Sequence, residues 1–435
     1  MNVPDVKYAW SGDVAIAYQE LGEGADDLVF LSFLANIYTL WQAPRFAPMA
    51  ERLATGRRLL VVNPRGVGLS DRPRGFTVES RMDDIRAVMD DAGSERATLL
   101  GWAEQSATCA YFAATYPSRV DRLILFNPWG WRYSRDPDAR QRALRQAEQD
   151  RADWGRRESL EALAAQINPQ WADDPQYLEW FVWHHRLTAS PASWMEFRRM
   201  QIDLDMTDVM PAIRVPTLVI AKEHVREEAE VVAAGIPDCE FVAVPGDGGA
   251  MQENDYPLEA IVAFLAGATQ HHIPDTVLAT VLFTDVVGST QRAAELGDDG
   301  WRDLLGRHNA VVRRELERFG GAELDTAGDG FLARFDGPVR AILCARAILD
   351  QMSTLGLELR AGIHTGECRR VEGKLAGIAV NVGARVSAAA GPSEVLVSGT
   401  VKDLVAGSGI EFEDRGEHGL KGVPGEWRLY AVSRA

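Results

Sequence analysis

Two aspartates in the C-terminal part of the chain stand where short apolar segments end. Asp285 ends the run VLATVLFTD and precedes VVGST, a turn whose backbone N–H groups can face an anion. Asp329 lies in AELDTAGDGFLARF, where Ala-Gly-Asp-Gly predicts the turn of a hairpin. A strand end and a hairpin tip can bring two carboxylates together, and carboxylates bind divalent cations that carry phosphates. Taken singly, each aspartate is more often than not an ordinary turn or helix-proximal residue.

A second pair of polar residues has helical spacing. Asn381 and Arg385 stand four residues apart in NVGAR, which places them on one side of a helix. An arginine fixed there can neutralise charge that develops on a phosphoryl group, and the asparagine can orient a ribose by hydrogen bonding. A solvated helix face explains the same spacing, so the pattern alone leaves both interpretations open.

The elements that must position these four residues begin at Val277. The pattern predicts a strand, a long helix, a hairpin, a helix and a strand. Apolar residues at steps of three and four between Trp301 and Phe319 indicate the long helix, and Gly320-Gly321 ends it.

The strings FTDVVGST, TAGDGF, RAGIHTGE and GIAVNVGAR together resemble the catalytic domain of class III adenylyl/guanylyl cyclases, over about Val277 to Val432. The resemblance implies an α+β domain with a ferredoxin-like core, and an active site formed between two such domains in a head-to-tail homodimer. It implies conversion of ATP to cyclic AMP and pyrophosphate with two Mg²⁺ or Mn²⁺ ions per active site. It assigns the metals to Asp285, Asp329 and Val286, catalysis to Asn381 and Arg385 of the opposite chain, and phosphate contacts to Lys421, Gly288, Ser289 and Thr290.

The positions that select the base depart from the family's usual pattern. The family usually has a Lys four residues before the second metal Asp, and an Asp seven residues before the Asn. Here those positions hold Asp325 and Lys374, with the charges exchanged. The exchanged pair can satisfy the edge of a shifted adenine, and it can also satisfy guanine. ATP is therefore favoured by the resemblance alone, and a simple salt bridge with lax base recognition is the alternative.

The N-terminal part alternates short apolar runs with helical segments, which predicts a mostly parallel sheet covered on both faces. The expected strands are Val14–Leu21, Leu28–Phe33, Leu59–Asn63, Ala97–Leu100, Leu123–Phe126 and Thr217–Ile220, and the expected helices include Arg81–Ala92 and Ser106–Tyr116. The segments NPRGVGLSDRP, LLGWAEQSA, VPTLVIA and PGDGGAMQENDYPLEAIVAFL resemble the α/β-hydrolase fold over about Asp5–Leu265, with a helical cap at about 131–210.

The residues that would make this fold a hydrolase are absent. The nucleophile of the G-x-S-x-G turn is replaced by Ala103, the acid position falls at about Val225, and the histidine position falls at Gly249. A methyl group cannot attack a carbonyl, so ester hydrolysis is not expected. Two interpretations remain: a pocket for a small-molecule ligand under the cap, or a scaffold whose pocket is filled by Trp102 and Phe33.

Composition limits the other function classes. The 435 residues include 46 Lys and Arg against 63 Asp and Glu, a net charge of −17, which disfavours nucleic-acid and anionic-membrane partners. The four cysteines are scattered, which argues against structural zinc and a disulfide framework. The N-terminus lacks the apolar core of a signal peptide, and no run of about 18 apolar residues occurs, so a cytoplasmic protein is expected.

The expected organisation is a hydrolase-like domain at 1–266, a linker at 267–276 and a cyclase domain at 277–435. It resembles hydrolase–cyclase fusions of actinobacteria, mycobacteria in particular. The predicted function is an adenylate cyclase of signal transduction with a sensory or regulatory pseudo-hydrolase domain. The alternatives are a weak or silent ligand-binding signalling protein, a cyclase with relaxed ATP/GTP selectivity, and an active hydrolase with an attached regulatory cyclase.

Overall fold

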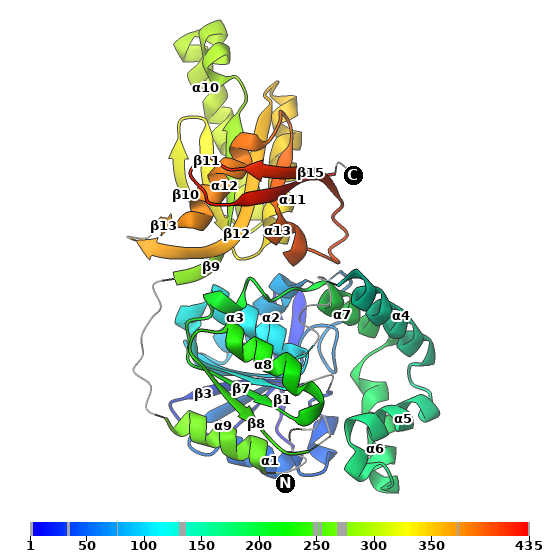
Figure 1. Ribbon diagram of the computed structural model, residues 1–435. Coiled ribbons are helices and arrows are strands. Elements are labelled where there is room, and N and C mark those ends of the chain that lie inside the picture. Colours follow the sequence, from blue (N-terminus) through cyan, green and yellow to red (C-terminus); the bar gives the residue numbers. More distant parts are fainter. Residues whose placement is uncertain are drawn as a thin grey trace. The chain divides into compact units, whose positions relative to one another are not determined.

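The chain forms two compact units, Met1–Pro274 and Asp275–Ala435, each built on its own sheet (Figure 1). The computed structural model describes residues 3–32, 35–75, 77–129, 136–246, 251, 255–267, 276–371 and 374–433. The linker predicted at 267–276 lies outside the described residues except for its two end positions. Within the described residues, no helix combines the length and the apolar character that crossing a membrane requires.

The first unit contains an eight-stranded sheet in the order β1-β2-β4-β3-β5-β6-β7-β8. β1 and β2 are antiparallel to their neighbours, and the pairs from β4 to β8 are parallel. The central strands are buried apolar runs, as expected for a sheet covered on both faces. The strands are β1 (Val6–Ser11), β2 (Val14–Leu21), β3 (Asp27–Leu31), β4 (Arg58–Val62), β5 (Ala97–Trp102), β6 (Val120–Phe126), β7 (Thr217–Ala221) and β8 (Cys239–Ala243).

Helices cover both faces of this sheet (Figure 1). One face carries α1 (Phe46–Leu53) and α9 (Tyr256–Ala266), and the other carries α2 (Val78–Asp91), α3 (Gln105–Thr115) and α8 (Arg226–Gly235). Four further helices fill the chain between β6 and β7, where the sequence predicted a helical cap: α4 (Pro137–Asp153), α5 (Arg157–Ile167), α6 (Pro175–Thr188) and α7 (Pro191–Asp203). This arrangement is the α/β-hydrolase fold that the sequence pattern predicted.

The second unit has a mixed sheet in the order β10-β11-β9-β12-β14-β16-β15, with β13 paired to β12. All its pairs are antiparallel except β12 with β14. The strands are β9 (Thr276–Val286), β10 (Ala322–Ala327), β11 (Gly330–Phe335), β12 (Leu359–Val371), β13 (Lys374–Ala376), β14 (Val395–Ser398), β15 (Phe412–Gly419) and β16 (Glu426–Val432). Its helices are α10 (Ser289–Arg318), α11 (Pro338–Thr354), α12 (Ile378–Ala389) and α13 (Gly399–Leu404).

Alternation along the strands of this second sheet divides its core between two faces. Leu282 packs with α10 and α11 on one face, whereas Val281, next to it, packs in a cluster with Ala379 of α12 on the other. Two glycines let α12 lie directly against the sheet. A Cβ on Gly362 would lie 2.0 Å from the backbone nitrogen of Ser387, and one on Gly383 would lie 2.7 Å from a methyl carbon of Val281.

Candidate functional site

The register of β9 against the β10–β11 hairpin brings the two predicted metal aspartates to one place. Thr284 of β9 is paired with Phe331 of β11, which puts Asp285 opposite Gly330. Asp329 precedes Gly330 in the two-residue turn of that hairpin. The strand end and the hairpin tip therefore meet as the sequence predicted.

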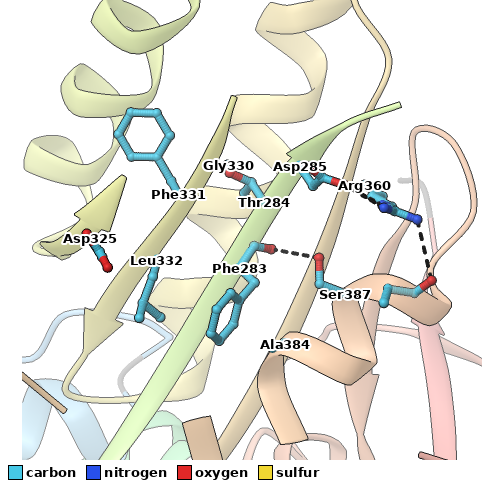
Figure 2. A pocket seen from close by; sticks show the side chains of 11 residues that line it. Phe283, Thr284, Asp285, Asp325, Gly330, Phe331, Leu332, Arg360, Ala384 and Ser387 are labelled. Carbon is cyan, nitrogen blue, oxygen red and sulfur yellow. Dashed lines mark hydrogen bonds and ion pairs between the residues drawn. The ribbon is translucent and has the colours of Figure 1, made fainter. Parts of the chain in front are cut away.

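A cavity of about 290 Å³ opens beside this strand end, between the sheet and α12 (Figure 2). Its polar lining includes Asp285, Asp325 and Arg360. Ala384 and Ser387 of α12 form the opposite wall, and the Ser387 hydroxyl donates to the Phe283 carbonyl at 3.5 Å. Asp325, the predicted base-selecting position, thus lines the same cavity as Asp285, the first predicted metal position.

Arg360 is a functional candidate that the sequence analysis missed. It lies directly across from Asp285 in the β12–β9 pair, and its Nη2 and Nε donate to Asp285 Oδ2 at 2.5 and 3.0 Å. The Asp285 and Arg360 side chains are about one-third exposed, so the ion pair stays open to a ligand. The available signal was the string RAGIHTGE, but its arginine can be matched to Asp285 only when the strand pairing is known.

Asp329 carries an orphaned oxygen. Its Oδ2 is buried, and among the described residues it has no hydrogen-bond partner. The buried imidazole of His308 on α10 interacts electrostatically with this carboxylate. Burial lowers the pKa of His308, while the contact with Asn309 and the charge of Asp329 act in the opposite direction.

The two carboxylates fit a divalent cation that also takes ligands from a substrate. Carboxylate oxygens are hard ligands that divalent cations prefer. Asp329 Oδ2 has no hydrogen-bond partner among the described residues, so a metal ion binding there would displace none. In the described part of the chain, no three His, Cys, Asp or Glu side chains lie close enough together to form a metal site by themselves. The Val286 side chain is buried in the core, so only its backbone can face an ion.

The turn after β9 leads into the start of α10. Gly288 adopts φ +67°, which favours glycine, and immediately precedes the helix. No side chain caps the helix start that Ser289 and Thr290 form, so its first backbone N–H groups suit a phosphate oxygen.

Other predicted residues lie apart from the cavity. Asn381 and Arg385 are exposed on α12, do not line the cavity, and make no side-chain hydrogen bond or ion pair with the described residues. Lys421 is exposed in the turn between β15 and β16. Lys374 begins β13, but its side chain lies outside the described part, so its pairing with Asp325 stays a prediction. Neighbours of Lys374 and Asp325, Leu375 and Leu324, do share one apolar cluster.

The first unit retains the shape of a nucleophile turn without the nucleophile. Ala103 adopts φ +52° between β5 and α3, a strained conformation for a residue other than glycine. It lines a cavity of about 980 Å³ together with Val225 and Trp102, so the aromatic residue lines the cavity without filling it. Gly249 and Phe33 lie outside the described residues. The Ser106 hydroxyl is buried and donates to the Gly101 carbonyl at 3.1 Å, which keeps it from replacing the nucleophile.

Comparison with known proteins agrees with both folds. Residues 32–213 match the alpha/beta hydrolase fold family, and residues 273–434 match the adenylate and guanylate cyclase catalytic domain family. The chain therefore carries an α/β-hydrolase domain followed by a class III adenylate/guanylate cyclase domain.

Individual relatives resemble one or the other part. A putative adenylate cyclase of Rhizobium meliloti is 31% identical over 156 residues, which are 34% of this chain and 26% of that protein. An uncharacterized protein of Mycobacterium tuberculosis is 28% identical over 177 residues, 39% of this chain and 61% of that protein. The alignments thus span less than two thirds of either curated relative. An esterase from Thermogutta terrifontis shares the fold of the first unit, with a TM-score of 0.51 at 24% identity, over 60% of this chain and 98% of the esterase.

Proposed function

We propose that this chain is an adenylate cyclase that converts ATP to 3′,5′-cyclic AMP and pyrophosphate at an active site shared by two copies of the chain. The observation that supports this most is the meeting of Asp285, Asp325 and Arg360 at one cavity of a cyclase-family domain, where Asp285 lies opposite Gly330, the residue that follows Asp329. The proposed domain limits are 1–266 for the hydrolase-like part, 267–276 for the linker and 277–435 for the cyclase part.

The reaction joins the ribose 3′-oxygen to the α-phosphorus and breaks the bond between the α-phosphorus and the bridging oxygen. The 3′-hydroxyl loses its proton, and pyrophosphate leaves with the bridging oxygen. Two Mg²⁺ or Mn²⁺ ions, held by Asp285 and Asp329, would supply a more acidic attacking hydroxyl and charge neutralisation on the phosphates.

The chain's own cations and N–H groups would hold the triphosphate. Arg360 orients Asp285 in this structure, and its planar guanidinium is suited to a phosphate placed beside that carboxylate. The α10 start at Gly288, Ser289 and Thr290 supplies backbone N–H groups to a phosphate oxygen.

A second copy of the chain would complete the site. Asn381 and Arg385 are exposed on α12 and do not line their own chain's cavity, which supports their use by a partner chain. There Arg385 would neutralise charge on the α-phosphoryl group, and Asn381 would orient the ribose. Lys421, also exposed, would contact a phosphate.

A second candidate function is a cyclase that accepts both ATP and GTP. It is favoured by the position of Asp325 in the cavity, where the family usually has a lysine. The hydrolase-like domain is proposed to regulate the cyclase domain and to leave esters intact, because a methyl group stands at Ala103.

The test is incubation of the purified chain with ATP or GTP and Mn²⁺, followed by chromatographic analysis of the products. Cyclic AMP from ATP, in excess of cyclic GTP from GTP, is expected. Equal yields would support the relaxed-selectivity function. If neither nucleotide gives a cyclic product, and the Asp285→Ala variant behaves identically, the cyclase proposal is wrong. The remaining interpretation is then a catalytically silent binding protein.

A further inference from the structure

A β-bulge in β10 decides which face of the sheet Asp325 occupies. Glu323 is paired with Ala333 of β11. Asp325 is paired with the neighbouring residue Leu332, so Leu324 is inserted as an extra residue between the two pairs. In a regular strand, Leu324 would stand opposite Leu332, and Asp325 would point to the other face. The bulge therefore moves the Asp325 side chain from one face of the sheet to the other.

The packing on the α12 face of the sheet agrees with this orientation. Leu332, the partner of Asp325, belongs to the apolar cluster on that face, and so does the extra residue Leu324. Opposed residues of two paired strands point to the same face. Asp325 and Leu332 accordingly line the cavity beside α12 together with Phe283 (Figure 2).

Glu323 and Thr326 stand on either side of the bulge and lie on the opposite face. Their partners in β11 are Ala333 and Phe331, which belong to the core cluster formed with α10 and α11. The Thr326 hydroxyl donates to Glu323 Oε1 at 2.6 Å. Residues three apart in a regular strand point to opposite faces, so this hydrogen bond depends on the bulge.

Arg313 of α10 binds the same carboxylate. Its Nε and Nη2 donate to Glu323 Oε2 and Oε1 at 2.8 and 3.0 Å, and its guanidinium carbon lies 5.6 Å from the ring centroid of Phe331. The hydrogen bonds from Arg313 and Thr326 lower the pKa of Glu323 to about 2, so this carboxylate is charged at neutral pH. We call Arg313, Glu323 and Thr326 the bulge clamp.

The geometry of the bulge clamp is of the kind that fixes a surface. The Arg313 side chain is 54% exposed and that of Glu323 is 31% exposed. Exposed ion pairs stabilise a protein little unless the arginine binds in two-point fashion or several groups are connected, and both conditions hold here. The clamp joins α10 to the strand on both sides of the bulge, so it opposes a slip of β10 to the regular register.

We infer that Arg313, Glu323 and Thr326 are positioning residues of the proposed nucleotide site, which hold the bulge in the form that turns Asp325 toward the purine base. The inference rests on the proposed function and concerns its base selection. None of the three is among the described residues that line the cavity, so they act through Asp325. A carboxylate at that position can accept from an amino or ring N–H group of a purine.

The test centres on Thr326→Val, which keeps the branched shape of the side chain and removes its hydroxyl. Thr326→Ser keeps the hydroxyl and should behave like the unaltered chain. The matched control is Thr354→Val at the end of α11, where an exposed hydroxyl donates to the Gln351 carbonyl at the same distance of 2.6 Å. Glu323→Gln, which weakens the hold of Arg313, should act in the same direction as Thr326→Val.

The first measurement is binding of 3′-deoxy-ATP and 3′-deoxy-GTP to the full chain with Mn²⁺, by calorimetry. These analogues lack the attacking hydroxyl, so they bind without turnover. Thr326→Val should shift the ratio of the two affinities by up to about tenfold, toward the ratio of Asp325→Ala, because a hydrogen bond to a charged group has about that value. In a chain that already carries Asp325→Ala, Thr326→Val should leave the ratio unchanged.

The second measurement is the cyclase reaction itself. Loss of base contacts should raise KM for ATP by up to about tenfold and leave kcat nearly unchanged, because the base is remote from the reacting atoms. A general loosening of the hairpin would instead displace Asp329 at its tip and lower kcat. The split between KM and kcat thus separates a positioning role from a merely structural one.

Four results would overturn the inference: neither analogue binds, Thr326→Val gives the same affinity ratio as Thr354→Val, its effect is the same with and without Asp325, or it lowers kcat alone. A shift of the affinity ratio that requires Asp325, in a chain that forms no cyclic AMP from ATP, would leave the inference standing and remove the proposed function. Cyclic AMP formation with an affinity ratio that no clamp variant changes would do the reverse.

Discussion

Replacing Glu104 by Gln should change how the stability of the first unit depends on pH. Burial raises the pKa of this carboxyl from 4.5 to about 7, against the opposing charges of Arg198 and Arg81. Between those pKa values the folded protein holds a proton that the unfolded chain has released. Stability contributed by Glu104 is therefore present below about pH 4.5 and is lost as the pH rises to about 7.

The size of this effect follows from the shift. A pKa change from 4.5 to about 7 corresponds to roughly 3 kcal/mol. Glu104→Gln removes this titrating group. The free energy of unfolding of the variant, minus that of the unaltered chain, should therefore rise by about that amount between about pH 4.5 and about pH 7. Below about pH 7 the folded parent holds Glu104 protonated and uncharged, so Gln at this position is a close match to it and Arg198 loses no counter-charge in this window.

The assay is urea denaturation at several pH values, followed by tryptophan fluorescence. Ten of the twelve tryptophans precede residue 267, so the signal reports mainly on the first unit. Glu158→Gln, at an exposed position of the cap, is the matched control. A variant-to-parent difference that stays flat with pH, or that moves toward the parent as the pH rises, would refute the reasoning.

The remaining predictions concern the two proposed activities. Asp285→Ala and Asp329→Ala should each abolish cyclic AMP formation with circular dichroism unchanged; parental rates in either variant would remove the metal assignment. Mixing Asp285→Ala chains with Arg385→Ala chains should restore activity if the site is shared, and verified heterodimers that stay inactive would place each site within one chain. Asp325→Lys and Lys374→Asp should each lower kcat/KM with ATP, while the double exchange recovers it; additive effects in this double-mutant cycle would show that the two residues do not read the base together. Short and medium-chain esters should show no turnover above a control without the chain, and turnover lost on Ser106→Ala would show that the nucleophile had been misplaced.

Much of the fold could be predicted because it rests on local patterns. The buried central strands are continuous apolar runs, and the Asp329 turn is marked by its glycines. The edge strands β1 and β8 were not predicted, because several of their residues are exposed and their apolar pattern is broken. The long helix expected between Trp301 and Phe319 forms the second part of α10; a non-helical Gly297, with φ +70° and ψ 169°, separates it from a short helical part that begins at Ser289 and was not predicted.

The residues that the sequence analysis missed depend on long-range pairing. Arg360 meets Asp285 only through the register of β12 against β9, 75 residues apart in the chain. Glu104 likewise lies near Arg198, which belongs to helix α7 of the cap and is far from Glu104 in the chain. Neither contact can be predicted from the residues next to it in the sequence. The spacing within NVGAR or TAGDGF, by contrast, lies within a single short segment and can be read directly.

The close approach of α12 to its sheet limits how the cyclase domain can respond to a signal. Backbone and side-chain atoms already occupy the space beside Gly362 and Gly383, so α12 packs against the sheet with no room for even one added methyl group between them. The exposed face with Asn381 and Arg385 is thereby fixed to the strands that bear Asp285. A displacement of this sheet would therefore be expected to carry Asn381 and Arg385 with it, so that the two halves of the proposed shared site move as whole domains.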